Sequence, residues 1–207
     1  MFILLRRGDI SIALRHPTLD ELAKKCNAVH AGVDGKTGET LMKSILAELF
    51  VRRNLRIQSW FGQNILGNDD GRALNNLELK ETKIRAKDHI LSKIAGYTFE
   101  TKVGIDYVSD LGEKKVAWNY INFDGFFVST MNLQFIWSTY DSILAAQLVI
   151  DLIRFCSLAQ SRGENGIIRT LSSFFKDPMG VSEQRFISQD EFLVTWALGK
   201  NNDTMLS

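Results

Sequence analysis

The sequence has few cysteines and almost no net charge. Cys26 and Cys156, the two cysteines among 207 residues, stand far apart in the sequence; they provide no framework of disulfides and suit a reducing compartment. Basic and acidic residues number 25 and 24, which leaves a formal charge of +1. No global field therefore attracts nucleic acid or an anionic membrane, and we expect neither as a partner.

The sequence also lacks an uninterrupted apolar segment of secretory or membrane-spanning length. Arg6 and Arg7 interrupt the apolar N-terminal run, and the longest later stretch contains Asp151 and Arg154. We expect a soluble, unsecreted, cytoplasmic protein with one well-filled domain or two small ones. No spacing typical of metal ligands links His16, His30 and His89, and we expect no metal site.

Two phosphate-binding motifs are absent. Gly35-Lys36-Thr37 matches the end of G-x-x-x-x-G-K-[ST], but the first glycine of that motif falls on His30. On its own this tripeptide is typical of a helix entry with a solvated lysine, so an enzyme of nucleoside triphosphates is the least favoured hypothesis. The dinucleotide-binding pattern G-x-G-x-x-G occurs nowhere in the chain.

The first quarter of the sequence predicts strand, turn and helix. Thr18 to Glu21 have the spacing of a capping box, which predicts a short helix to Lys25 and then a small strand over 28–31. Apolar residues recur at helical intervals from Thr40 to Phe50 and predict a second helix.

The middle of the sequence changes to the period of strands. Alternation predicts strands around 55–57, 103–107, 116–128 and 131–137, with a tight connection at Ser129-Thr130 and a mostly antiparallel sheet. A helix that carries Lys80, Lys83 and Lys87 interrupts this region.

The last third is predicted to be helical. Residues 141–162 form a helix that is apolar nearly all round and should be buried, with Asp141 as its N-cap. A further helix carries Ile167 to Phe174, and Ser188 caps a last helix that Gly199 closes.

Six polar segments resemble, in the same order, the signature segments of the myo-inositol-1-phosphate synthase family. They are DGKTGET at 34–40, NILGNDDG at 64–71, TKIRAK at 82–87, LGEKK at 111–115, DSILAA at 141–146 and FFKDPMG at 174–180. Each is weak alone, because a charged helix face is usually solvated and a loop often satisfies its own polar groups. Their shared order makes the resemblance strong.

The resemblance implies an enzyme of inositol and phospholipid biosynthesis that converts glucose 6-phosphate to myo-inositol 1(3)-phosphate with catalytic NAD. The C5 hydroxyl is oxidised, C6 loses a proton and attacks C1, and C5 is reduced again. Negative charge develops beside a phosphate, so several cations are needed. The lysines implied are Lys83, as proton carrier at the C5 hydroxyl, and Lys87, Lys115 and Lys176, which bind phosphate and stabilise the oxyanion at C1. Lys83 and Lys87 are four apart and share a helix face.

The resemblance also places a set of residues near NAD, with Asp70 close to Lys83 as well. The set is Asp34, Thr37, Asn68, Asp69, Asp70, Lys83, Gly112, Glu113, Asp141 and Ala145. Asp69, Glu113, Lys114 and Gln147 depart from the residues usual in the family. The glycine-rich segment that the family carries upstream has no counterpart here, so we expect little turnover by this chain alone.

The expected fold is α/β, with a partial Rossmann-like NAD-binding layer and an inserted α+β domain. Residues 1–40 are a remnant of the NAD-binding layer, and residues 140–207 return to it. Residues 41–139 form the catalytic and oligomerisation domain with a mostly antiparallel sheet, and the resemblance implies a homotetramer. The alternative is a truncated, non-catalytic homologue that acts as a sugar-phosphate-binding or oligomerisation module.

Overall fold

The computed structural model describes residues 17–68 and 90–199. The chain forms two compact units, and each is described here by itself. The first unit holds residues 1–37 and 144–207, and the second runs from residue 38 to residue 143. These divisions lie close to residues 40 and 140, where we expect the domains to change, while the roles given to the domains stay predictions.

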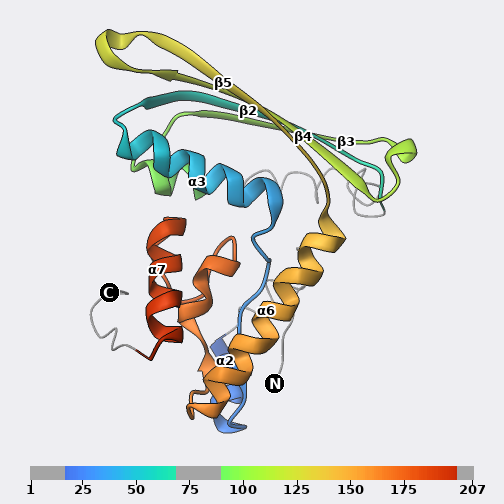
Figure 1. Ribbon diagram of the computed structural model, residues 1–207, viewed down its shortest axis with the longest axis vertical. Coiled ribbons are helices and arrows are strands. Elements are labelled where there is room, and N and C mark those ends of the chain that lie inside the picture. The colour runs from blue at the N-terminus through green and yellow to red at the C-terminus, as the bar shows by residue number, and fades with distance from the viewer. Residues whose placement is uncertain (1–16, 69–89, 200–207) are drawn as a thin grey trace. The chain divides into compact units, whose positions relative to one another are not determined.

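The second unit is built on a four-stranded sheet with the strand order β3-β2-β4-β5 (Figure 1). Its strands are β2 (Arg56–Leu66), β3 (Glu100–Tyr107), β4 (Lys114–Asp124) and β5 (Thr130–Tyr140). β2 pairs with β3 in parallel, whereas β4 is antiparallel to both β2 and β5. The expected mixed α/β fold with a mostly antiparallel sheet is confirmed.

Helix α3 (Gly38–Arg52) lies along one face of this sheet (Figure 1). Residues 90–95 are also helical, and their apolar side chains join the same core. Trp60 of β2 and Ile121 of β4 are buried there because alternate residues of a strand point to the same face. The predicted helix that carries Lys80, Lys83 and Lys87 lies outside the described residues.

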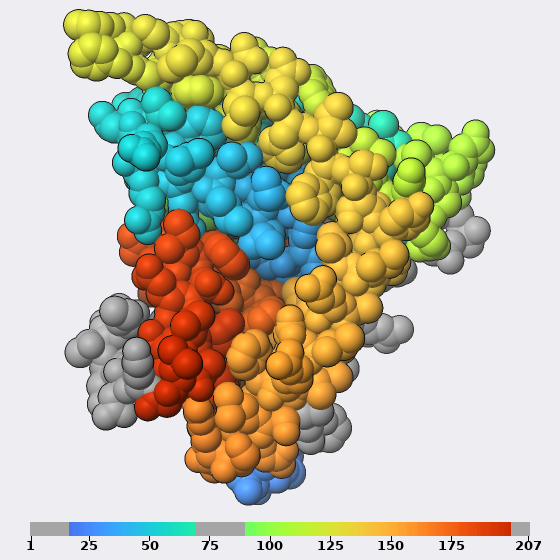
Figure 2. Space-filling model, viewed as in Figure 1, coloured from blue at the N-terminus to red at the C-terminus, as the bar shows by residue number. Residues whose placement is uncertain are grey.

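The connection between β4 and β5 differs from the prediction. The predicted strand over 116–128 was too long, because β4 ends at Asp124 and Phe126–Val128 form a short 3-10 turn, η2. The turn closes with a hydrogen bond from the Gly125 N–H to the Ser129 carbonyl at 3.0 Å. Phe-Phe-Val contains none of the residues that are usual in turns, so the sequence did not predict a turn at this position. Figure 2 shows this hairpin end, in yellow, projecting beyond the atoms of α3.

The first unit contains a two-stranded parallel pairing of β1 (Val29–His30) with β6 (Gly166–Ile167). Around it are α2 (Pro17–Lys25), most of α6 (Asp141–Ser161), the 3-10 helix η3 (Arg169–Phe174) and α7 (Phe186–Ala197). α2 and β1 confirm the predicted helix and strand. The core of the unit is an apolar cluster that includes Val29, Leu152, Leu171 and Phe175.

Two helix predictions in this unit were wrong in detail. Residues 167–174 begin in β6 and continue as the 3-10 helix η3, because pairing with β1 extends the chain at Ile167. α7 begins at Phe186, so Ser188 lies within the helix and does not cap it. The predicted end holds, since Gly199 has a φ of 71° and its N–H bonds to the Trp196 carbonyl.

Helix α6 is buried along one stripe only, whereas its composition predicted burial all round. Leu148, Leu152, Cys156 and Ala159 recur at helical spacing and are buried, while Ile143 and Ile150 are 66% and 59% exposed. Among the described residues this one helix is long and apolar enough to cross a membrane by length and composition. Core helices of soluble proteins pass the same test, so the property alone assigns no membrane.

Candidate functional site

The clearest predicted site group in the second unit lies at one end of the sheet. Lys115 near the start of β4 pairs with Leu66 at the end of β2, and its neighbour Lys114 pairs with Tyr140. Asp141 follows directly as the first residue of α6. The register therefore brings Lys115 and Asp141 together, and their Nζ and Oδ2 atoms are 3.3 Å apart.

Two further predicted segments meet at the same end. Gly67 lies against the backbone of Gly112, so closely that a Cβ on Gly67 would stand 2.5 Å from the Gly112 nitrogen. Gly112 itself has a φ of 53°, which glycine tolerates best. Asn68 follows Gly67, and Glu113 follows Gly112, so both reach this end of the sheet.

Lys115 belongs to a largely buried polar cluster that we name the Glu39 cluster. It consists of Glu39 and Lys43 on α3, Asn64 on β2, and Lys115 and Asn119 on β4. Glu39 Oε1 is 2.9 Å from Lys43 Nζ and accepts from the Asn64 and Asn119 amides at 3.5 and 3.4 Å. Glu39 Oε2 faces Lys115 Nζ at 3.7 Å.

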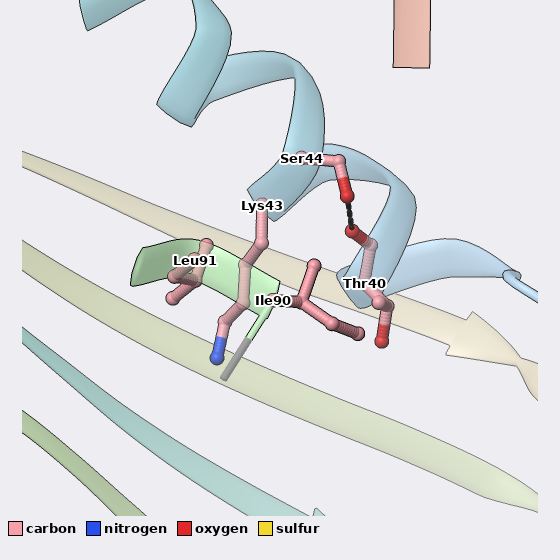
Figure 3. A pocket seen from close by; sticks show the side chains of 5 residues that line it. All are labelled: Thr40, Lys43, Ser44, Ile90 and Leu91. Carbon is pink, nitrogen blue, oxygen red and sulfur yellow. Dashed lines mark hydrogen bonds between the residues drawn. The ribbon is translucent and has the colours of Figure 1, made fainter. Parts of the chain in front are cut away.

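Lys43 reaches this cluster from above the sheet. Its side chain descends from α3 toward the strands beside Ile90 and Leu91, while Ser44 bonds back to the Thr40 carbonyl at 3.0 Å (Figure 3). Lys43 is 4% exposed, and its ammonium group stands 5.9 Å from the ring centre of Trp60. A buried ammonium with a carboxylate and an aromatic face as neighbours is well compensated.

The first unit holds a second ion pair of predicted site residues. Lys176 Nζ donates to Asp34 Oδ1 at 2.9 Å. The backbone fixes this pair, because the Lys176 N–H bonds to the Asp34 carbonyl and Gly35 bridges Phe175 in antiparallel fashion. The segments DGKT and FFKDP, far apart in the sequence, are thus neighbours.

Lys36 is buried, whereas the helix-entry reading predicted a solvated side chain. It is 3% exposed, and its ammonium donates to Gln189 Oε1 of α7 at 3.1 Å. A phosphate-cradling lysine must reach out to its ligand. This geometry therefore argues against the hypothesis of a nucleoside triphosphate site.

The remaining predicted residues fall into two groups. Thr37 and Ala145 belong to the first unit and are half-buried. Asp69, Asp70, Lys83 and Lys87 lie outside the described residues. Lys115 and Lys176 belong to different units, so the expected meeting of lysines from separate segments stays a prediction.

Sequence reasoning missed Glu39 and Lys43 as members of the site. Glu39 lies within the motif DGKTGET, and Lys43 is one helical turn further along, so the signal was an i, i+4 pair beginning in a motif. Such pairs usually face solvent, which is why their burial was not expected. Within residues 17–68 and 90–199, no three His, Cys, Asp or Glu side chains gather in a way that could hold a metal ion.

Fold and site together define an α/β protein with paired lysines and carboxylates, a set suited to an anionic polar ligand. The family model described as myo-inositol-1-phosphate synthase matches residues 38–142, nearly the whole of the second unit. This chain therefore belongs to the myo-inositol-1-phosphate synthase family.

Individual relatives agree. The chain is 33% identical over 202 residues to inositol-3-phosphate synthase 1 of Bacteroides thetaiotaomicron, covering 93% of this chain and 46% of that protein. It is 31% identical over 164 residues to the inositol-3-phosphate synthase of Candida glabrata, covering 72% and 30% respectively. The chain thus spans less than half the length of these curated relatives.

Solved structures of proteins named for the same family are also similar to this chain. A myo-inositol-1-phosphate synthase-related protein from Thermotoga maritima matches with a TM-score of 0.82 and 28% identity, over 97% of this chain and 53% of that one. Inositol-3-phosphate synthase from Caenorhabditis elegans matches with a TM-score of 0.77 and 25% identity, over 92% and 41%.

Proposed function

We propose that this chain carries the sugar-phosphate site of an inositol-3-phosphate synthase, which converts glucose 6-phosphate to myo-inositol 1(3)-phosphate in the cytoplasm. The observation that carries the proposal is the family match over residues 38–142, which includes Lys83, Lys87 and Lys115. The relatives bear the name inositol-3-phosphate synthase. Because the chain spans only part of them, the activity belongs to this proposal.

Lysines do most of the proposed work. Lys115 and Lys176, with Lys87, bind the phosphate and stabilise the oxyanion that forms at C1 when C6 attacks the aldehyde. Lys83 moves the proton at the C5 hydroxyl, with Asp70 beside it. Lys115 is supported in this role by its place at a sheet end, with its side chain 14% exposed and Asp141 close by.

NAD is the cofactor that the family implies, and when bound it would take a hydride from C5 and later return it. The donors of this chain suit the ribose and amide parts of such a group, since carboxylates, hydroxyls and amides bind those parts well. Asp34, Thr37, Asn68, Glu113 and Asp141 supply these groups, with backbone at Gly112 and Ala145. A glycine-rich pyrophosphate turn of the pattern G-x-G-x-x-G is absent from the sequence, so we expect NAD to bind weakly to the chain alone.

Turnover tests the proposal. The chain is incubated with NAD and glucose 6-phosphate labelled with 13C, and inositol phosphate is followed by NMR. We expect slow formation of cyclised product that Lys115→Met abolishes, while Lys114→Met on the opposite face of β4 leaves it intact. Binding of glucose 6-phosphate without any product would instead support the alternative, a non-catalytic sugar-phosphate module.

A further inference from the structure

Within the described residues, two lysines share the Glu39 carboxylate. Oε1 pairs with Lys43 Nζ at 2.9 Å and accepts hydrogen bonds from the amides of Asn64 and Asn119. Oε2 is directed to Lys115 at 3.7 Å. Glu39 and Lys43 are almost fully buried, while the Lys115 side chain is 14% exposed. The network therefore runs from the core outward to Lys115.

The surroundings are shaped for these polar groups. Gly62 of β2 lies next to them, and a Cβ there would stand 3.1 Å from Lys43 Nζ and 3.2 Å from Asn119 Oδ1. Asn119 in turn accepts from the Trp60 indole at 2.9 Å. Apolar residues of similar volume commonly stabilise a core as well as or better than a buried ion pair. Core stability alone therefore gives little reason for this network.

Two carboxylates attract Lys115, but neither forms a short hydrogen bond with it. Its ammonium lies 3.3 Å from Asp141 and 3.7 Å from Glu39, both longer than the about 2.7–2.9 Å of a close charged hydrogen bond. An ammonium group has three N–H donors. The two carboxylates therefore hold the ammonium group by charge and still leave a donor for an anionic ligand.

We propose that Glu39 is a positioning residue, which holds Lys115 through Oε2 while Lys43, Asn64 and Asn119 neutralise and orient Oε1. The inference rests on the proposed function for the identity of the ligand, a sugar phosphate. The arrangement of Glu39 and Lys115 itself can be tested without any ligand.

Competitive acylation of lysines, read by mass spectrometry, provides that test. Acylation needs an amine that the reagent can reach, and an amine held between two carboxylates is less accessible than one held by a single carboxylate. Lys114 is the internal reference, because it is the next residue of β4 and points to the opposite face, over Tyr140. In Glu39→Gln we expect the labelling ratio of Lys115 to Lys114 to rise by about threefold or more, as for the loss of one ion pair.

Two variants separate positioning from general destabilisation. Glu48→Gln removes another fully buried carboxylate from the same helix, and we expect it to leave the labelling ratio unchanged. Glu39→Gln with Lys43→Met removes both charges of the inner pair, so that no buried ammonium stays uncompensated. If Glu39→Gln alone does not fold, this double variant decides, and its ratio should rise as well.

An unchanged ratio in a folded Glu39→Gln or double variant overturns the inference, and so does an equal rise in Glu48→Gln. The proposed function is read separately from the wild-type chain. Glucose 6-phosphate should slow labelling of Lys115 and leave Lys114 unaffected. Absence of that protection contradicts the sugar-phosphate site without touching the positioning of Lys115 by Glu39.

Discussion

His30 lies in the core of the first unit, and within the described residues neither of its ring nitrogens has a hydrogen-bond partner. Burial lowers the pKa of His30 from its ordinary 6.5, and the negative charge of Asp20 opposes this only in part. The folded state therefore favours the neutral imidazole, whereas the unfolded chain takes up a proton at its ordinary pKa.

Stability should consequently fall on mild acidification. The contribution of His30 is complete above the unfolded pKa of 6.5 and is lost as the pH falls from there toward the lower folded pKa. Urea unfolding between about pH 7.5 and pH 5 should show this slope, and His30→Leu should flatten it. Asp20 and Glu183, whose pKa values are lowered from 3.8 and 4.5, act at more acidic pH. An identical slope in His30→Leu would contradict the assignment.

Among the elements, the turns after β2 and before β4 are locked together by Gly67 and Gly112. An added Cβ on Gly67 meets backbone atoms at 2.5 Å, whereas one on Gly104 of β3 meets the end of the Gln63 side chain, which can rotate away. Neither Gly67 nor Gly104 has a positive φ. Substitution by alanine at Gly67 and at Gly104 can therefore be compared directly, since only the neighbouring atoms differ.

Gly67→Ala should destabilise the chain by about 1–3 kcal/mol, as overpacking does, and Gly104→Ala by less than about 1 kcal/mol. Urea unfolding monitored by tryptophan fluorescence measures both values. Equal effects of the two substitutions would contradict the close contact between Gly67 and Gly112.

Helix α6 offers a second matched pair. Leu152 is fully buried and Ile150, two residues earlier, is 59% exposed. Leu152→Ala should lower the free energy of unfolding by about 2–5 kcal/mol through loss of contacts and a cavity, whereas Ile150→Ala should change it by about 0.5 kcal/mol or less. Comparable losses at both positions would mean that α6 is buried all round.

The elements also show how far the sequence could predict this structure. Leu133, Phe135 and Trp137 alternate and form β5, because period and burial agree there. Ile167, Ile168, Leu171 and Phe174 have helical spacing, yet β1 draws Ile167 into a strand through a pairing that no local pattern contains. Motif order predicted Lys115 and Asp141 as site residues with different roles, and the structure brings their side chains within 3.3 Å of each other, while their roles stay predictions. Burial of Glu39 and Lys43 depends on Asn64 and Asn119 from distant strands, and such partners are not visible in a helix sequence.

At the scale of the whole molecule, the β4–β5 hairpin end is an unusual surface. Phe126, Phe127 and Val128 are 82%, 85% and 75% exposed, and Phe127 and Val128 both have a φ of 57°. Bulky residues rarely adopt this conformation. Self-association would cover these exposed aromatic side chains. The family resemblance predicts such an association, in the form of a homotetramer.

A hairpin-end variant tests that association. Phe126→Ser with Phe127→Asn removes the rings, and asparagine tolerates the left-handed backbone at residue 127. Light scattering over a concentration series should show that the variant needs about tenfold more protein to associate. Val108→Ser, at a site that is 42% exposed, is the control and should behave as the wild type. A wild-type chain that stays monomeric throughout contradicts the prediction.

Calorimetric titration with glucose 6-phosphate tests most directly whether this chain presents lysines to an anionic sugar. We expect saturable binding without NAD, weakened by about tenfold or more in Lys115→Met because a charged hydrogen bond to the phosphate is lost. Lys114→Met, on the opposite face of the same strand, should bind as the wild type does. Absence of binding, or equal affinity in Lys115→Met and the wild type, would contradict the account.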